Sequence, residues 1–76
     1  MRTTRDGTAI KRERLQKIHG MLRGAGDVPL RRFLAACSYT IGLNENTTMR
    51  YLQNLAELEL VEIDEAANVV REVVKI

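Results

Sequence analysis

The feature that most constrains this chain is an apolar stripe at helical spacing, followed at once by a glycine and a second such stripe. The first stripe consists of Leu30, Phe33, Leu34, Cys37 and Ile41. These residues recur every three to four positions, the period at which side chains return to one face of an α-helix. Gly42 then interrupts the pattern. Two amphipathic helices joined by so short a turn favour a compact, mainly helical domain.

The segment after this glycine predicts the second of the two helices. Asn44 has the short polar side chain favoured at a helix N-cap, and we expect the helix to run from about Glu45 to Leu58. At about 100° per residue, Thr48, Leu52 and Leu55 share the buried face. The polar residues of the opposite face and its flanks are Asn46, Arg50, Gln53 and Glu57, with Thr47, Met49 and Asn54 beside them.

The N-terminal third predicts another helix behind a basic arm. Residues 1–8 have no periodicity and are expected to form a flexible arm, whereas helical spacing begins near Ala9 and continues to Arg23. Gly24 ends that pattern. Pro29 suits the first turn of the next helix, because the missing N–H would have no intrahelical partner there. We therefore expect an arm at 1–8 and one domain over 9–76.

The C-terminal segment predicts two short strands. Residues 60–63 alternate, residues 64–68 form a polar loop, and residues 69–76 are rich in β-branched side chains, which together favour an antiparallel hairpin. The spacing of Ala66 and the valines also fits a helix, so strand and helix both stay open for residues 66–76. The expected class is mainly α with a small β-hairpin (α+β).

Charge is distributed unevenly along the chain. The formal net charge is only +2, but residues 1–32 carry nine Lys or Arg against three acids, and residues 33–76 carry three against seven. This polarity suggests a molecule that presents one side to a polyanion. A basic, solubilising front half on an ordinary domain would give the same pattern.

Short length and missing motifs narrow the function classes. A chain of 76 residues buries only about 60% of its unfolded surface, and it contains no catalytic pairing or phosphate loop, so we expect no enzyme and no cofactor. His19 has no neighbouring ligand, so no metal site is expected. A single Cys37 indicates a reducing, cytoplasmic location. No apolar stretch approaches the ~20 residues that cross a bilayer, and no small-molecule ligand is evident.

Residues 42–61, GLNENTTMRYLQNLAELELV, resemble the signature of the winged helix-turn-helix family. The likeness is clearest at Gly42, Leu43, Asn44, Thr47, Leu52, Leu55, Leu60 and Val61, and it covers roughly residues 28–74. It implies three helices plus a two-stranded wing, as in small bacterial and archaeal transcriptional regulators. It also implies binding of double-stranded DNA, with helix 45–58 in the major groove, and a homodimer that binds paired half-sites. The dimer contact would use the last strand or the first helix.

Two residues and one loop depart from the family's pattern. Thr48 stands at a core position usually held by valine, and Glu59 stands where glycine is common. The wing loop, residues 64–68, is acidic and lacks the Lys or Arg of wings that touch DNA. We therefore expect the wing to be structural.

The resemblance and the side-chain chemistry together single out candidate DNA contacts. Arginine pairs with guanine, Asn and Gln pair with adenine, and the methyl groups of Thr and Met suit thymine. In this family the second helix lies across the DNA backbone. The candidates are Asn44, Asn46, Thr47, Met49, Arg50 and Gln53 on the third helix, and Arg31 and Arg32 on the second. A protein–protein interaction module in a larger assembly and an RNA-binding winged helix are the alternative interpretations.

Overall fold

Three helices and three short strands make up the part of the chain that the computed structural model describes, residues 7–74. Their order is α1 (Gly7–Leu22), β1 (Val28–Pro29), α2 (Leu30–Ile41), α3 (Glu45–Glu57), β2 (Val61–Asp64) and β3 (Val69–Glu72). The α+β class is confirmed, and the alternative left open for residues 66–76 resolves as strand over residues 69–72, after a turn at residues 66–68. Gly7 and Thr8 belong to α1, so only residues 1–6 of the predicted arm lie outside the described residues.

The sheet has a third strand beside the predicted two-stranded hairpin. The strand order is β1-β3-β2, with both pairings antiparallel. The predicted two-stranded hairpin is β2–β3, and β1 adds a third strand through Val28 opposite Val70 and Pro29 opposite Val69. Two residues are too few to show an alternating pattern, and only their pairing with a distant segment makes them a strand.

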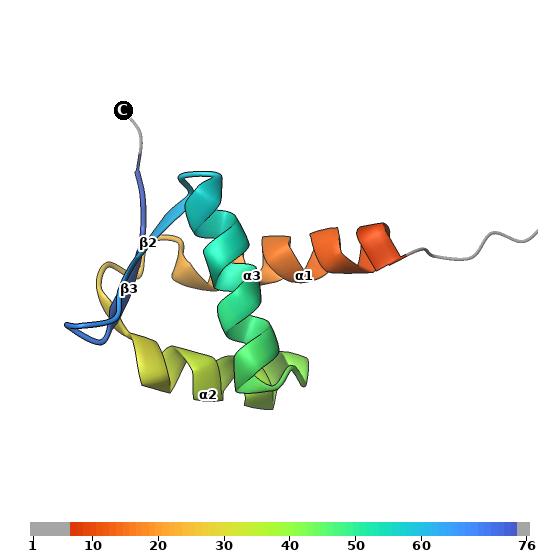
Figure 1. The fold of residues 1–76 in the computed structure, drawn as a ribbon, viewed down its shortest axis with the longest axis horizontal. Helices are drawn as coiled ribbons and strands as arrows, with labels where there is room; N and C mark the ends of the chain where they lie inside the picture. The colour runs from red at the N-terminus through yellow and green to blue at the C-terminus, as the bar shows by residue number, and fades with distance from the viewer. Residues whose placement is uncertain (1–6, 75–76) are drawn as a thin grey trace, which may run out of the picture.

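The core lies where α3 crosses the other helices and meets the sheet. Figure 1 shows α3 running across α1 and α2, with the strands gathered toward one end of α2. Thr48 and Leu52 are fully buried and Leu55 is 2% exposed, so the predicted inner face of α3 is confirmed. The buried residues that pack with it include Ile18 and Leu22 of α1, Phe33 and Cys37 of α2, and Val61 and Val70 of the sheet.

The two residues that depart from the family's pattern are accommodated differently. The Thr48 hydroxyl donates a hydrogen bond of 3.0 Å to the carbonyl of Asn44, so its buried polar group has an acceptor within the helix. Glu59 adopts a φ of 62°, in the left-handed region that glycine tolerates best. Its backbone N–H donates to the Ala56 carbonyl and closes the end of α3. Glu59 thus adopts at this joint a backbone conformation more typical of glycine.

Cys37 belongs to the core of the described residues. Its side chain is fully buried, and desolvation raises the pKa of the thiol to about 11. The thiol therefore stays protonated at neutral pH. Because the thiolate is the nucleophilic form, this residue behaves as a small apolar side chain and not as a reactive group.

The turn between α2 and α3 depends on the backbone conformation of Gly42. Its φ is 83°, and its N–H donates to the carbonyls of Cys37 and Ser38, which closes the C-terminal end of α2. Leu43 then turns into the core, where it is 6% exposed. The turn thus ends one helix and anchors the start of the next within three residues.

Replacing Gly42 with alanine tests this turn. A Cβ at this position meets nothing within 4 Å, so the expected loss comes from the left-handed backbone alone. We expect Gly42→Ala to lower the free energy of unfolding by about 1–2 kcal/mol, measured by urea denaturation.

Gly20→Ala is the matched control. Gly20 lies in α1 with an unstrained backbone and open space around it, so the same substitution should stabilise the protein, by about 0.4–1 kcal/mol. Equal effects at the two glycines would contradict the proposed role of the Gly42 conformation.

Candidate nucleic-acid interface

The N-terminal end of α3 is capped by Asn44, as the sequence predicted. The Asn44 side chain accepts a hydrogen bond of 2.8 Å from the backbone N–H of Thr47, and the Asn44 carbonyl accepts another from the N–H of Thr48. This cap fixes the first turn of α3. It also engages the Asn44 amide oxygen, so only the amide nitrogen of this candidate residue remains for a partner.

The outer face of α3 is open to solvent along its length. Asn46, Arg50, Gln53 and Glu57 are all exposed. At about 100° per residue these four positions fall within about 60° of one another, so they form one polar row opposite the buried face. Three of the candidate residues therefore share a surface, and Glu57 is the acid at its C-terminal end.

The residues that flank this row are less exposed to solvent than the row itself. Thr47 and Met49 are half-buried, and Met49 packs against the core. Tyr51 is also half-buried against the core. A partner laid along α3 would therefore meet the methyl groups of Thr47 and Met49 at the edge of the surface, with Asn46, Arg50 and Gln53 at its centre.

Arg31 and Arg32 lie apart from α3, in the first turn of α2. Both are exposed, and neither takes part in an ion pair among the described residues. The first turn of α2 contains no acid. Cations at a helix N-terminus oppose the helix dipole, which typically costs about 0.3–1 kcal/mol each. The stability of α2 therefore gives no reason for these two arginines.

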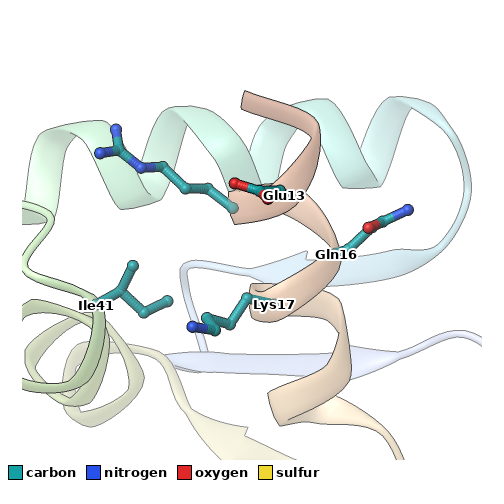
Figure 2. A pocket seen from close by; sticks show the side chains of 5 residues that line it. Glu13, Gln16, Lys17 and Ile41 are labelled. Atoms are coloured by element: carbon teal, nitrogen blue, oxygen red, sulfur yellow. The ribbon is translucent and has the colours of Figure 1, made fainter. Parts of the chain in front are cut away.

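The cations of α1 line a separate surface. A hollow of about 360 Å³ lies between α1 and the C-terminal end of α2, and Figure 2 shows Lys17 and Ile41 reaching toward each other across it while Gln16 points away. The lining also includes Glu13 and Arg14. None of these side chains is a buried polar group, and both signs of charge are present, so the hollow defines no particular ligand chemistry.

The outer face of the sheet is held by one arginine. Arg71 of β3 donates through Nε to the Asp27 carboxylate at 2.7 Å and through a terminal nitrogen to Glu62 of β2 at 2.8 Å. The hydrogen bond from Arg71 holds the pKa of Asp27 below its ordinary value, and the two carboxylates raise that of Arg71. The only basic side chain of the described hairpin is therefore already paired.

Asn68, in the hairpin turn, is the residue that sequence reasoning missed. Its carbonyl accepts a hydrogen bond of 2.9 Å from the N–H of Leu30, and its side-chain oxygen accepts one of 3.0 Å from the N–H of Arg31. The hairpin turn thus caps α2, whose own N-cap, Pro29, offers no side-chain acceptor. The signal in the sequence was an asparagine at the end of a turn, but nothing local connects it to a helix 37 residues away.

Metal binding and membrane insertion have no structural support in the described residues. No group of His, Cys, Asp and Glu side chains there has an arrangement that would hold a metal ion. None of the described helices combines the length and the apolar character that a bilayer crossing requires.

Comparison with known proteins adds no family to this geometry. No family model matches the chain, and neither a curated protein nor a solved structure matches it.

The pairing of Arg71 with Asp27 makes stability depend on acid pH. A carboxylate whose pKa is lowered on folding stabilises the protein above its ordinary value of 3.8, and this contribution is lost as pH falls through the lowered value. We expect Arg71→Gln to destabilise the protein at about pH 7 and to differ less from the wild type at about pH 2. Urea denaturation at the two pH values measures this.

Asp27→Asn serves as the companion variant, since it removes the titrating partner and leaves Arg71 in place. It should be destabilised at neutral pH and converge on the wild type in acid. A loss of stability in Arg71→Gln that is the same at both pH values would mean that the carboxylate pairing is not its source.

Proposed function

We propose that this protein is a winged helix-turn-helix DNA-binding protein that acts as a cytoplasmic transcriptional regulator. The observation that carries the proposal is the exposed row of Asn46, Arg50 and Gln53 on α3, opposite its fully buried face. A helix fixed by three buried residues presents these side chains rigidly. Arginine and amide groups are those that read base edges in the major groove.

The order of the elements supports this assignment. Three helices followed by an antiparallel hairpin, with α2 and α3 joined by a glycine turn, is the layout implied by the likeness of residues 42–61 to that family. The short β1 beside the hairpin and the start of α2 fits the same layout. The fold by itself fixes no function, so the proposal depends on the surface of α3.

In the proposed complex, phosphate contacts come from α2 and base contacts from α3. Arg31 and Arg32 would hold the DNA backbone, which supplies affinity without sequence preference. Thr47 and Met49 would border the bases, and Asn44 would lie near a phosphate at the N-terminal end of α3. The hairpin would make no contact, because its turn is acidic and Arg71 is engaged.

The proposal includes a homodimer, because one module of this size buries too little DNA surface for strong specificity. An apolar groove of about 170 Å³ between α1 and the C-terminal end of α3 is the surface we assign to the second copy. Leu15, Leu55 and Leu60 line it, and Leu58, also in its lining, is 61% exposed. Arg12, Gln16 and His19 complete the lining and give the leucines a polar border. In a two-fold dimer the same patch of each copy would face its partner.

One observation favours a different function. The described hairpin and the C-terminal end of α3 are acidic, and the paired Arg71 leaves no free cation there. A module that binds another protein in a larger assembly would tolerate this surface better than one that wraps DNA. Binding to duplex DNA therefore decides between the two functions.

A salt titration tests the proposed phosphate contacts. We expect the protein to bind random-sequence duplex DNA, with log affinity falling linearly as log salt rises between about 50 and 200 mM. Arg31→Ala and Arg32→Ala should each reduce the slope by about 0.9, the value of one phosphate contact on duplex DNA. Arg23→Ala is the control, since Arg23 lies in the loop between α1 and β1, outside α2, and its guanidinium is 3.8 Å from the Glu72 carboxylate.

Absence of duplex binding would reject DNA binding and favour the protein-interaction module. Tighter binding to RNA of the same length would favour the RNA-binding alternative. A slope that Arg31→Ala and Arg32→Ala leave unchanged would remove α2 from the interface.

Arg50→Ala tests base recognition by α3. On a site selected from random DNA, the variant should lose about 1–3 kcal/mol of discrimination at one base pair and keep its preferences elsewhere. Glu57→Ala, at the far end of the same exposed row, should change no base preference. A uniform loss of affinity across all sequences would instead make Arg50 a backbone contact.

A further inference from the structure

The N-terminal end of α2 takes its cap from the hairpin turn and not from its own sequence. Asn68 accepts two consecutive backbone N–H groups, that of Leu30 with its carbonyl and that of Arg31 with its side-chain oxygen. Pro29 precedes them with no side-chain cap. These two N–H groups of α2 are therefore occupied within the fold.

The backbone of Asn68 restricts which residues can occupy the position. Its φ is 58°, in the left-handed region where glycine, Asn and Asp are the residues that fit best. Glycine lacks a side-chain acceptor for the N–H of Arg31. Asn and Asp are thus the two residues that satisfy both the conformation and the second hydrogen bond.

Asn and Asp cap helices about equally well, and the two differ in how they interact with the helix dipole. An aspartate accepts the same hydrogen bond and also interacts favourably with the helix dipole. It would additionally sit beside Arg31 and Arg32, which have no ion-pair partner among the described residues. A neutral cap at this point gives up that stabilisation and leaves the positive charge of both arginines uncompensated.

We propose that Asn68 is a positioning residue for DNA binding, whose neutral amide holds the first turn of α2 against the hairpin while leaving the charge of Arg31 and Arg32 for the phosphate backbone. This inference rests on the proposed DNA-binding function. It gives the hairpin a role in binding that requires no contact with DNA. The hairpin turn acts through α2, because the Asn68 cap fixes the first turn of this helix, which contains Arg31 and Arg32.

The central experiment compares Asn68→Asp with Asn68→Ala and Ala66→Asp. Asn68→Asp keeps the acceptor and adds one negative charge at the cap. Asn68→Ala removes the acceptor, and Ala66→Asp adds the same charge to the exposed hairpin turn without a bond to α2. Thermal unfolding and affinity for random-sequence duplex DNA as a function of salt are measured for each variant.

Stability and binding should respond in opposite directions. We expect Asn68→Asp to melt at or above the wild-type temperature and Asn68→Ala to melt below it, since only the alanine loses the cap. At about 50 mM salt, Asn68→Asp should bind DNA about two- to tenfold more weakly than the wild type, with a shallower salt dependence. Ala66→Asp should have a smaller effect on both binding measurements.

A double-mutant cycle with Arg31→Ala/Arg32→Ala identifies the source of the effect. If the new carboxylate acts by neutralising these arginines, Asn68→Asp should change affinity little once both are removed. An undiminished effect in that background would overturn the inference, as would a loss of affinity no larger than that of Ala66→Asp. Melting of Asn68→Asp as low as that of Asn68→Ala would also overturn it, because the carboxylate would then not replace the cap.

The two proposals fail separately in this design. Absence of duplex binding by the wild type rejects the proposed function and the inference together. The inference alone is rejected if the wild type binds with the expected salt dependence but the effect of Asn68→Asp on affinity adds in full to that of Arg31→Ala/Arg32→Ala.

Discussion

Burial of one face of α3 is the constraint on which the rest of the structure depends. Thr48, Leu52 and Leu55 are at most 2% exposed, and they bring α1, α2 and the sheet onto a single helix. Because side chains on a helix are fixed relative to one another, burying this face also fixes where the opposite face points. The exposure of Arg50 and its amide neighbours is therefore a consequence of core packing and not of a flexible surface.

Arg71 differs from the arginines proposed to contact DNA in how it is paired. Arg71 is held by Asp27 and Glu62 and joins a loop and two strands across the outer face of the sheet. Arg31, Arg32 and Arg50 are exposed and take part in no such pair. Surface ion pairs contribute little to stability, so the pairing of Arg71 matters chiefly because it removes a cation from the hairpin. Available positive charge is thereby concentrated on the helices.

At the start of α2, unlike at Arg71, positive charge is left unpaired at some cost to the stability of the helix. Two arginines oppose the helix dipole, no acid offsets them in the first turn, and the cap that holds them is a neutral amide from the hairpin. The two arginines weaken the helix slightly, and the neutral cap does not offset their charge. Functional sites are where proteins commonly depart from the most stable arrangement, and the departures here all preserve positive charge at one point of the surface.

The sequence alone determined the helices, the turn between α2 and α3, and the outward face of α3. All of these depend on local features: helical periodicity, the glycine at position 42, and an Asn44 cap that bonds a residue three positions later. It placed Asn46, Arg50 and Gln53 on one exposed row, with Met49 on its flank and Asn44 as the helix cap, as the structure does. Only the tertiary structure decided that Arg71 is paired and that Asn68 caps α2. The contacts of Arg71 with Asp27 and of Asn68 with Arg31 join residues 44 and 37 positions apart. No pattern within a helix or strand encodes such contacts, because they arise only when the packed core brings those segments together.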